Sequence, residues 1–333
     1  MTVNQVRAFV FIEGDDGPLL LLTRRKFPPY TGKLSLPGGF VKSGMTSAET
    51  IRYKLERETS LKVEESQLHS FKVKSTKYGD PRGDFLCEYF LAVLPKQSLE
   101  LNEEESKEKS EFYYLDEIEE LGFDHGAILC ELLGSMWGEF PLLPVPPVRI
   151  SLPELFGPKD IDFSKKVVFY GGTFNPWHHG HMACVELCPN QNLVIVTDSN
   201  PWKLKDKTQI ACDWREYREI ALKFERTRIP VFPGYKGMTE GNPTVDWLPS
   251  MSGTKEILLG LDSFENLPQW KDSKKLLENL KTIYVTPRNF NQKASSKEIE
   301  KQLKSLNPKI KIQHLPDHEF KDVNSTALRE ENQ

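Results

Sequence analysis

The segment from Val167 to Met182 constrains the fold of this chain more than any other; it reads V-V-F-Y-G-G-T-F-N-P-W-H-H-G-H-M. Val167 to Tyr170 is apolar, with β-branched and aromatic side chains, which favours a strand buried in a parallel sheet. Gly171 and Gly172 follow and allow the backbone to turn tightly and approach a ligand. A helix is predicted from Met182 to Leu187. A strand, a glycine turn and a helix N-terminus form an anion site, because backbone N–H groups and the helix dipole face the phosphate.

Two histidines at this turn, His178 and His181, can donate hydrogen bonds to a triphosphate as negative charge builds up on it. The pattern G-G-T-F-N-P-x-H-x-G-H resembles the signature of the nucleotidyltransferases that join a mononucleotide to the AMP part of ATP. The resemblance implies that both histidines are catalytic and that His179 fills the variable position. It also implies that the first five residues of this motif bind nucleotide: Gly171, Gly172, Thr173, Phe174 and Asn175. The alternative is a pair of histidines in a polar loop.

The composition is that of an ordinary globular chain. At 333 residues two domains are expected, and a net charge of −4 indicates no general attraction to nucleic acid or to an anionic membrane. The five cysteines are too few and too scattered for a disulfide framework, and we expect Cys184 and Cys188 to be buried thiols, with a metal site as the alternative. No apolar run approaches a membrane span and no signal peptide is evident, so a cytoplasmic location is expected.

The first half of the chain predicts a strand pair, a glycine turn and a charged helix. Strands are expected at Gln5–Phe11 and Pro18–Leu22, and a helix at Thr46–Leu61. With L-S-L-P-G-G-F-V between them at Leu34 to Val41, this order resembles the Nudix fold. The Nudix signature, G-x5-E-x7-R-E-U-x-E-E-x-G-U with U aliphatic, can be aligned from Gly39.

The metal-binding part of that signature is not preserved. In an active member, three helix carboxylates spaced i, i+3 and i+4 converge on divalent cations. Here these positions are Lys54, Arg57 and Glu58, so two of the three are cations and would repel a metal ion. Lys54 and Glu58 are instead spaced for an i,i+4 salt bridge. We therefore expect the Nudix hydrolase chemistry to be lost.

Other segments resemble one branch of the Nudix proteins: K-Y-G-D-P-R-G-D-F at Lys77 to Phe85 and L-G-F-D-H-G-A-I-L at Leu121 to Leu129. That branch contains ADP-ribose hydrolases and Nudix-related regulators of NAD metabolism, in which the domain senses a nucleotide. The resemblance implies an ADP-ribose or NAD site near Arg82, whose alternative role is a solvated turn residue. The remaining candidates for this site are Gly38, Gly39 and Glu58.

A proline-rich stretch separates the two halves of the chain. The prolines between Phe140 and Pro158 prevent a long helix and indicate a stiff, extended connection. We predict a Nudix-like domain at residues 1–140, a linker at 141–164 and a nucleotidyltransferase domain at 165–333.

The second half contains further strands whose ends carry candidate ligand residues. Lys203 follows the predicted strand Asn192–Thr197, at the end where open parallel sheets bind ligands, and its alternative is a solvated charge. The segments from Gly241 to Leu248 and from Ile257 to Trp270 resemble the bacterial nicotinate-mononucleotide adenylyltransferases. The resemblance implies that Trp270 stacks on the pyridine ring, Thr244 holds its substituent and Asp262 lies near the adenylate. The alternative for Trp270 is a core aromatic.

The last recognisable motif is V-N-S-T-A-L-R at Val323 to Arg329. It resembles I-S-S-T-x-I-R, in which Ser and Thr cap a helix and donate to phosphate while Arg meets the β/γ-phosphates. The resemblance therefore assigns Ser325, Thr326 and Arg329 to those roles, with Asn324 where the family has Ser.

The sequence thus predicts an α/β protein: an N-terminal Nudix α/β/α sandwich with a mixed sheet, then a Rossmann-like nucleotidyltransferase fold with a parallel sheet. The expected reaction is adenylyl transfer from ATP, with Mg²⁺, to nicotinate or nicotinamide mononucleotide. The Nudix part is expected to sense ADP-ribose or NAD, and a homo-oligomer remains open. The alternatives are a non-catalytic nucleotide sensor and a bifunctional enzyme that still hydrolyses ADP-ribose through carboxylates outside the signature, such as Glu64 or Glu65.

Overall fold

The computed structural model describes residues 2–76, 80–96, 109–140, 143, 145–198, 214–234, 243–288 and 296–331, except for the side chains of Thr326, Glu330 and Glu331. The chain forms two compact units. The described residues of the first unit fall within 2–136, 145–153 and 214–218, and those of the second within 137–143, 154–198 and 219–331. The predicted linker, 141–164, therefore contributes residues to both units.

The first unit is built on a mixed sheet with the strand order β3-β2-β1-β6-β5. β1 pairs in parallel with β6 and antiparallel with β2, while β4 pairs with β1 and β7 with β2. The strands are β1 (Gln5–Gly14), β2 (Gly17–Arg24), β3 (Leu34–Ser35), β4 (Gly38–Phe40), β5 (His69–Ser75), β6 (Leu86–Leu94) and β7 (Lys109–Tyr114). The helices are α1 (Ser47–Thr59) and α2 (His125–Trp137).

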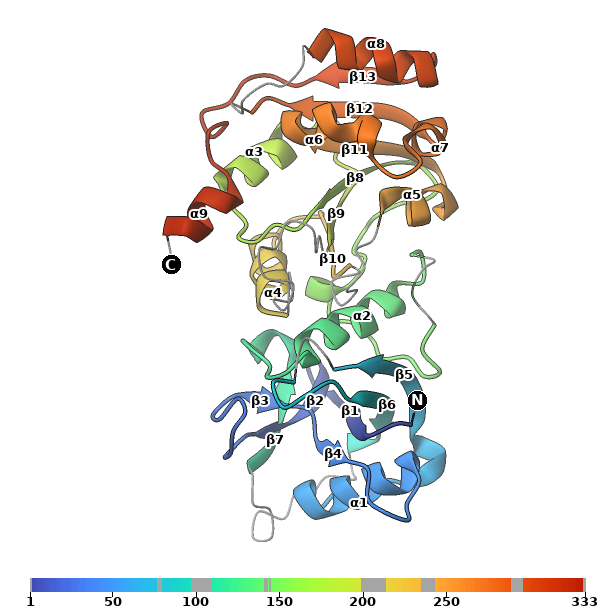
Figure 1. Cartoon of the computed structure of the whole chain (residues 1–333), viewed down its shortest axis with the longest axis vertical. Helices are drawn as coiled ribbons and strands as arrows, with labels where there is room; N and C mark the ends of the chain where they lie inside the picture. The colour runs from blue at the N-terminus through green and yellow to red at the C-terminus, as the bar shows by residue number, and fades with distance from the viewer. Residues whose placement is uncertain are drawn as a thin grey trace. The chain divides into compact units, whose positions relative to one another are not determined.

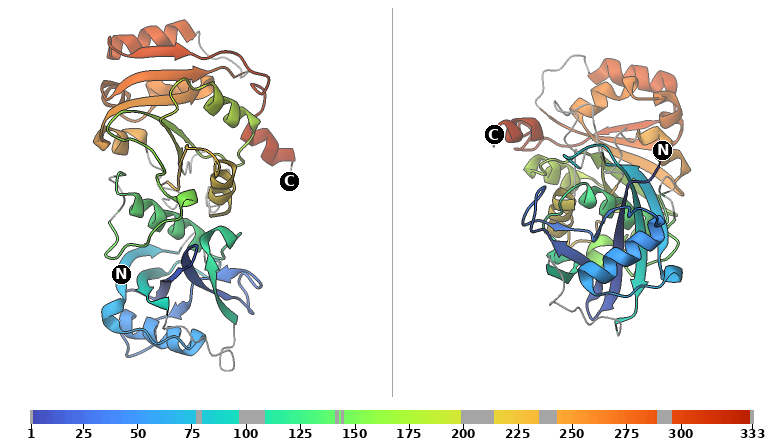
Figure 2. Two further views of the ribbon diagram at one scale, coloured as in Figure 1. Left: turned by 180° about the vertical axis from the view of Figure 1, so that it is seen from behind. Right: turned by 60° about the horizontal axis from the view of Figure 1, so that its bottom comes forward.

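The alternation along β1 places a helix on each face of this sheet. Val6, Ala8 and Val10 share a buried cluster with Ile51 and Leu55 of α1. The intervening Arg7 contacts His125, the first residue of α2, from the opposite face. Figures 1 and 2 show α1 and α2 on opposite sides of the sheet. The predicted α/β/α sandwich with a mixed sheet is confirmed.

The second unit is built on a parallel sheet with the order β10-β9-β8-β11-β12-β13. The strands are β8 (Lys166–Gly172), β9 (Leu193–Thr197), β10 (Val231–Phe232), β11 (Thr254–Gly260), β12 (Leu280–Thr286) and β13 (Lys311–His314). Numbered along the chain, this order is 3-2-1-4-5-6, the Rossmann order, in which the central strands β8 and β11 flank the switch point. The predicted Rossmann-like parallel sheet is confirmed.

The helices of the second half lie between these strands in the sequence, except for the final helix, which follows the last strand. They are α3 (His179–Leu187), α4 (Trp214–Lys223), α5 (Thr244–Trp247), α6 (Leu261–Asn266), α7 (Ser273–Glu278), α8 (Ser296–Leu306) and α9 (Ser325–Glu331). α3 begins three residues before the predicted Met182, for a reason given below. Within the described parts of the chain, no helix combines the length and the hydropathy needed to cross a bilayer.

Candidate functional site

The loop after β8 leads directly into α3, and histidine side chains fix this connection. Nδ1 of His178 accepts the N–H of Gly180 at 3.1 Å, and Nδ1 of His181 accepts the N–H of His178 at 3.3 Å. His178 is thus the N-cap of α3, and His181 completes the reciprocal pair of a capping box. These side-chain caps explain why the helix begins at His179, where propensity alone did not predict it.

The same hydrogen bonds determine where each imidazole carries its proton. A neutral imidazole that accepts at Nδ1 carries its hydrogen on Nε2. The two rings stack with centroids 3.7 Å apart and are each 7% exposed. Nε2 of His178 is buried and has no hydrogen-bond partner within the described structure. A buried donor without a partner is costly unless a ligand uses it.

Electrostatics keep His178 in its neutral form. Burial first, and then the positive charges of Arg288 and His179, lower the pKa of His178 to about 4. At neutral pH this side chain is therefore an uncharged N–H donor. It lies at the carboxyl end of β8, beside the switch point where Rossmann sheets bind their ligands.

Two charged residues from the neighbouring strands complete this part of the site. Asp262 lies in the first turn of α6 after β11, and Arg288 follows β12. A Cβ atom on Gly260 would lie 2.7 Å from Oδ1 of Asp262 and 3.0 Å from Nε of Arg288, so both side chains pack closely over this glycine and would have to shift for a larger residue. Asp262 was a candidate from the sequence, whereas Arg288 was missed. Arg288 could have been identified from the sequence because it is a cation that follows a predicted strand at its carboxyl end. Lys203 was chosen as a candidate for the same reason.

The C-terminal helix α9 contacts the loop after β8. Ser325 Oγ donates to the carbonyl oxygen of Pro176 at 3.1 Å, and Arg329 donates to that of Asn175. Figure 2 shows α9 next to α3. The structure thus brings both predicted residues to the site, with these donors directed to the loop backbone. The side chain of Asn324 caps α9 by accepting the N–H of Ala327 at 2.9 Å, a role that the family resemblance gave to Ser and Thr. The side chain of Thr326, and all of Lys203, lie outside the described residues.

The backbone of the glycine-containing loop is shaped around Phe174. Gly171 and Gly172 end β8, and a Cβ atom on Gly172 would lie 2.8 Å from the ring of Phe174. Phe174 itself has a left-handed φ of 49° and packs edge-on against His181 at 5.0 Å. Thr173 and Asn175 lie on either side of it, half-buried. This aromatic contact holds the loop against the histidine pair.

The two residues predicted to hold a pyridine ring lie in segments joined by an ion pair. Thr244 is the first residue of α5, and Trp270 follows the 3-10 turn Leu267–Gln269. Lys271 binds both carboxylate oxygens of Asp246 at 2.9 Å, which links the turn before α7 to α5. Trp270 is half-buried rather than part of the core.

The Nudix candidates gather where β4 meets α1. Gly38 and Gly39 belong to β4, and the N–H of Gly38 donates to Oε2 of Glu58 at 3.2 Å. Nζ of Lys54 lies 3.5 Å from Oε1 of Glu58, so the expected i,i+4 pair is present. Arg82 binds Asp80 at 2.6 Å and, with Gln5, holds the pKa of that carboxyl at about 2 against the opposing effect of burial.

The two carboxylates outside the Nudix signature, Glu64 and Glu65, lie apart from the Lys54–Glu58 pair. Glu64 and Glu65 are exposed and lie within 3.7 and 4.0 Å of Arg52. Arg52 and Lys54 project from opposite sides of α1, because the side-chain direction turns by about 100° per residue and these positions are two residues apart. Among the described residues, no three His, Cys, Asp or Glu side chains are placed to hold a metal ion. Cys184 and Cys188 are buried and donate to the carbonyl oxygens of Gly180 and Asn190, as expected of buried thiols.

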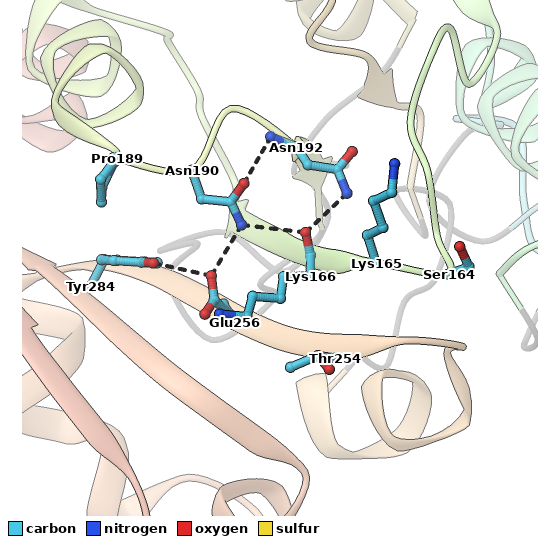
Figure 3. A pocket seen from close by; sticks show the side chains of 9 residues that line it. All are labelled: Ser164, Lys165, Lys166, Pro189, Asn190, Asn192, Thr254, Glu256 and Tyr284. Carbon is cyan, nitrogen blue, oxygen red and sulfur yellow. Dashed lines mark hydrogen bonds between the residues drawn. The ribbon is translucent and has the colours of Figure 1, made fainter.

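A groove of about 620 Å³ lies at the opposite, amino-terminal edge of the parallel sheet. Its buried centre is Glu256, whose carboxylate accepts from Asn190 at 3.1 Å, Thr282 at 2.8 Å and Tyr284 at 3.0 Å. Figure 3 shows Asn190 and Tyr284 directed at this carboxylate. Both oxygens are satisfied by neutral donors, so we interpret this cluster as structural support.

Comparison with known proteins gives one family model and several related proteins. Residues 3–132 match the family model described as the NUDIX domain. A probable nicotinate-nucleotide adenylyltransferase of Flavobacterium psychrophilum is 30% identical over 139 residues, which are 37% of this chain and 68% of that protein. An ADP-ribose pyrophosphatase of Methanocaldococcus jannaschii is 34% identical over 110 residues, 33% of this chain and 63% of that protein.

A solved structure of a bifunctional NMN adenylyltransferase/ADP ribose pyrophosphatase from Francisella tularensis, complexed with AMP and a Mn ion, is 25% identical. Its TM-score is 0.33, and the match covers 40% of this chain and 42% of that chain, less than half of its length.

The Rossmann order of the parallel sheet and the histidine-capped loop at its switch point define a nucleotide-binding α/β protein with an additional Nudix domain. Within that class, the chain belongs to the nicotinate-nucleotide adenylyltransferase family.

Proposed function

We propose that the second unit transfers the adenylyl group of ATP to nicotinate mononucleotide, or to its nicotinamide counterpart, releasing pyrophosphate. The observation that carries this proposal is the neutral, buried His178, whose Nε2 donor has no partner within the described structure at the carboxyl end of β8. The names of the related adenylyltransferases agree with the reaction.

In the proposed reaction a phosphate oxygen of the mononucleotide attacks the α-phosphorus of ATP, and the bond to the β-phosphate breaks. Pyrophosphate leaves with the electron pair of that bond. His178 and His181 donate to the triphosphate, and Arg288 adds a positive charge where negative charge builds up. Positioning and electrostatics carry this chemistry, so no covalent protein intermediate is formed. Mg²⁺ enters with ATP and offsets the charge of its phosphates.

The remaining candidates are assigned to binding. We propose that the loop from Gly171 to Asn175 approaches the nucleotide, that Asp262 lies near the adenylate and that Lys203 contacts phosphate. Trp270 would stack on the pyridine ring, since its flat face suits an electron-poor ring, and Thr244 would meet the substituent. Ser325, Thr326 and Arg329 would act on the phosphates, which requires Ser325 and Arg329 to exchange their contacts with the loop carbonyls for the ligand.

We propose that the Nudix domain binds ADP-ribose or NAD and reports its level to the second unit, and that the chain acts in the cytoplasm. The domains would be 1–140 and 165–333, joined by 141–164. The bifunctional alternative is favoured by the name of the relative from Methanocaldococcus jannaschii. It would need carboxylates beyond Glu64 and Glu65, which pair with Arg52, about 200° around α1 from Lys54.

Pyrophosphate release from ATP and Mg²⁺ tests the proposal directly. Pyrophosphate release by the purified chain is measured with nicotinate mononucleotide and with nicotinamide mononucleotide in separate reactions. The same two reactions are run with His181→Ala. The matched control is His179→Ala, an exposed histidine in the same turn. Turnover that is lost in His181→Ala and kept in His179→Ala is expected, and the faster mononucleotide names the substrate. No turnover with either would favour the non-catalytic sensor. AMP released from ADP-ribose with Mg²⁺ would instead favour the bifunctional enzyme.

A further inference from the structure

The cation site of the Nudix fold is replaced by side chains in this chain. The ammonium group of Lys54 lies 3.5 Å from one oxygen of Glu58, while the other oxygen accepts the N–H of Gly38. The Lys54 and Glu58 side chains are 22% and 28% exposed, so this pair is largely shielded from water. Lys54 carries a positive charge beside the carboxylate and the backbone at which a divalent cation would be expected. The donor set present does not fit a metal ion.

A second cation, Arg7, approaches the same place. A Cβ atom on Gly39 would lie 3.1 Å from Nζ of Lys54 and 4.0 Å from a terminal guanidinium nitrogen of Arg7. The two positive groups therefore converge over the β4 backbone. Burial raises the pKa of Glu58, while Lys54, the Gly38 N–H and Arg7 all favour its charged form.

Arg7 is buried and has three neutral partners among the described residues: it donates to the carbonyl oxygen of Val6 at 3.1 Å and to Oε1 of Gln5 at 3.5 Å, and its third partner is His125. Its Nε lies 3.3 Å from Nε2 of His125, while Nδ1 of His125 accepts the N–H of Leu36 at 3.0 Å. Burial, followed by the charges of Arg7 and Arg25, lowers the pKa of His125 well below its usual value, so the ring is neutral. With Nδ1 accepting, its proton lies on Nε2, and the contact places N–H against N–H. Arg7 gains little from the contact with His125, and no carboxylate is among these three partners, so its positive charge is available to attract an anion.

Two more arginines, Arg25 and Arg82, lie with Arg7 around the aromatic ring of Phe123. The guanidinium carbons of Arg7, Arg25 and Arg82 lie 5.5, 4.9 and 5.5 Å from the centroid of Phe123. Arg82 also lies 5.2 Å from the ring of Phe40, which is 45% exposed. Gathering like charges around one ring costs free energy, which a bound anion would recover.

The charges of this cluster sum to a positive value. Its four cations are Arg7, Arg25, Lys54 and Arg82, and the carboxylates paired with them are Glu58 and Asp80, so these six side chains carry four minus two, or +2. Asp124 also lies near Arg7, and burial raises the pKa of its carboxyl, which favours the uncharged form. A diphosphate ester carries two negative charges at neutral pH, and the exposed face of Phe40 beside Arg82 suits a planar base.

We propose that the Nudix domain binds the diphosphate of a dinucleotide or nucleoside diphosphate sugar without a divalent cation, with Lys54 supplying the positive charge of the missing metal. This inference rests on the proposed sensor role of the domain and specifies its chemistry. It also explains why a ligand would be held and not cleaved: the basic side chains neutralise the diphosphate, but no carboxylate-bound metal activates water.

The test is calorimetric titration of the full chain with ADP-ribose and with NAD, once in EDTA and once in Mg²⁺. We expect the same dissociation constant for the bound ligand in both buffers. Lys54→Met should weaken binding at least tenfold, the loss of one charge-assisted contact, and Lys54→Arg should restore most of it. The matched control is Lys62→Met, because Lys62 is 82% exposed and forms only a 3.9 Å pair with Glu56. Thermal unfolding of each variant establishes that it is folded.

The outcomes separate the two proposals. Binding that requires Mg²⁺, or binding unaffected by Lys54→Met in a folded variant, overturns the metal-free site and leaves the sensor role standing. Binding of neither ligand in either buffer overturns both. Adenylyl transfer, measured separately, is independent of these results.

Discussion

The imidazole rings of His178 and His181 stack at 3.7 Å, each with Nδ1 occupied by a backbone N–H of the same turn. This arrangement commits both Nε2 atoms to carry hydrogen. It makes the histidine pair a rigid donor group rather than a proton acceptor.

The protonation of His178 can be measured directly. Because its pKa in the folded chain is about 4 against about 6.5 in the unfolded chain, the unfolded state binds more protons between these values. His178 therefore contributes stability that is present above pH 6.5 and lost as the pH falls toward 4. Nitrogen-resolved NMR should show an Nε2–H tautomer that does not titrate between pH 7 and 5.5. A titration midpoint near 6.5 would contradict this.

Substitution of either histidine should slow turnover. Loss of one donor to the developing charge typically costs about 10²- to 10³-fold in kcat, so His178→Ala should fall in this range. His178→Asn, which can still donate, should be less affected, and His179→Ala should match the wild type. Equal rates for all variants would remove the histidines from the mechanism.

Arg288 provides a prediction that the sequence did not supply. We expect Arg288→Met to reduce kcat/KM for ATP by about 10- to 100-fold, the range for a lost charged contact. It should also raise the pKa of His178, because Arg288 is a cation that lowers it. Arg226→Met, at an exposed position after α4, is the control for kinetics and for the NMR titration. An unchanged His178 pKa would show that the two groups do not interact.

The ion pair between Lys271 and Asp246 should affect one substrate only. Lys271→Met frees the turn that carries Trp270, so KM for the mononucleotide should rise about threefold, consistent with the small free energy of an exposed pair. KM for ATP should not change. Lys304→Met, which breaks a comparable pair with Glu300 on α8, is the control. A parallel rise in both KM values would argue against a separate pyridine site.

The groove at the amino-terminal edge of the sheet should matter for stability. Glu256→Ala removes the acceptor of three donors, of which Thr282 and Tyr284 make buried hydrogen bonds, and should lower the free energy of unfolding by about 3 kcal/mol. Glu256→Gln keeps one acceptor and should cost about half as much. Urea denaturation measures both, with exposed Glu298→Ala as control. A large loss of turnover in folded Glu256→Gln would instead indicate a catalytic role.

Much of the architecture could be predicted from the sequence because it depends on local patterns. The apolar run from Val167 to Tyr170 forms a buried parallel strand, and the resemblance of the surrounding motifs supplied the two folds that are observed. The loss of the Nudix carboxylates followed from the resemblance to the family signature, and Lys54 forms its i,i+4 pair with Glu58 as the spacing predicted.

The features that were missed depend on contacts between distant segments or on unusual caps. The start of α3 at His179 follows from imidazole caps, which helix propensities do not describe. Arg288 acquires its role only because β12 ends near Gly260, and Arg7 meets His125 across 118 positions of the chain. Hydrophobic periodicity carries no information about such pairs.

The hydrogen bond from Ser325 to the carbonyl oxygen of Pro176 also has a consequence for biosynthesis. The two residues are 149 positions apart, so a ribosome that adds about 5 to 20 residues per second delivers the second roughly 7 to 30 s after the first. Throughout that interval the loop after β8 is exposed on the nascent chain without the helix that later contacts it. The contact between this loop and α9 therefore waits for the synthesis of α9.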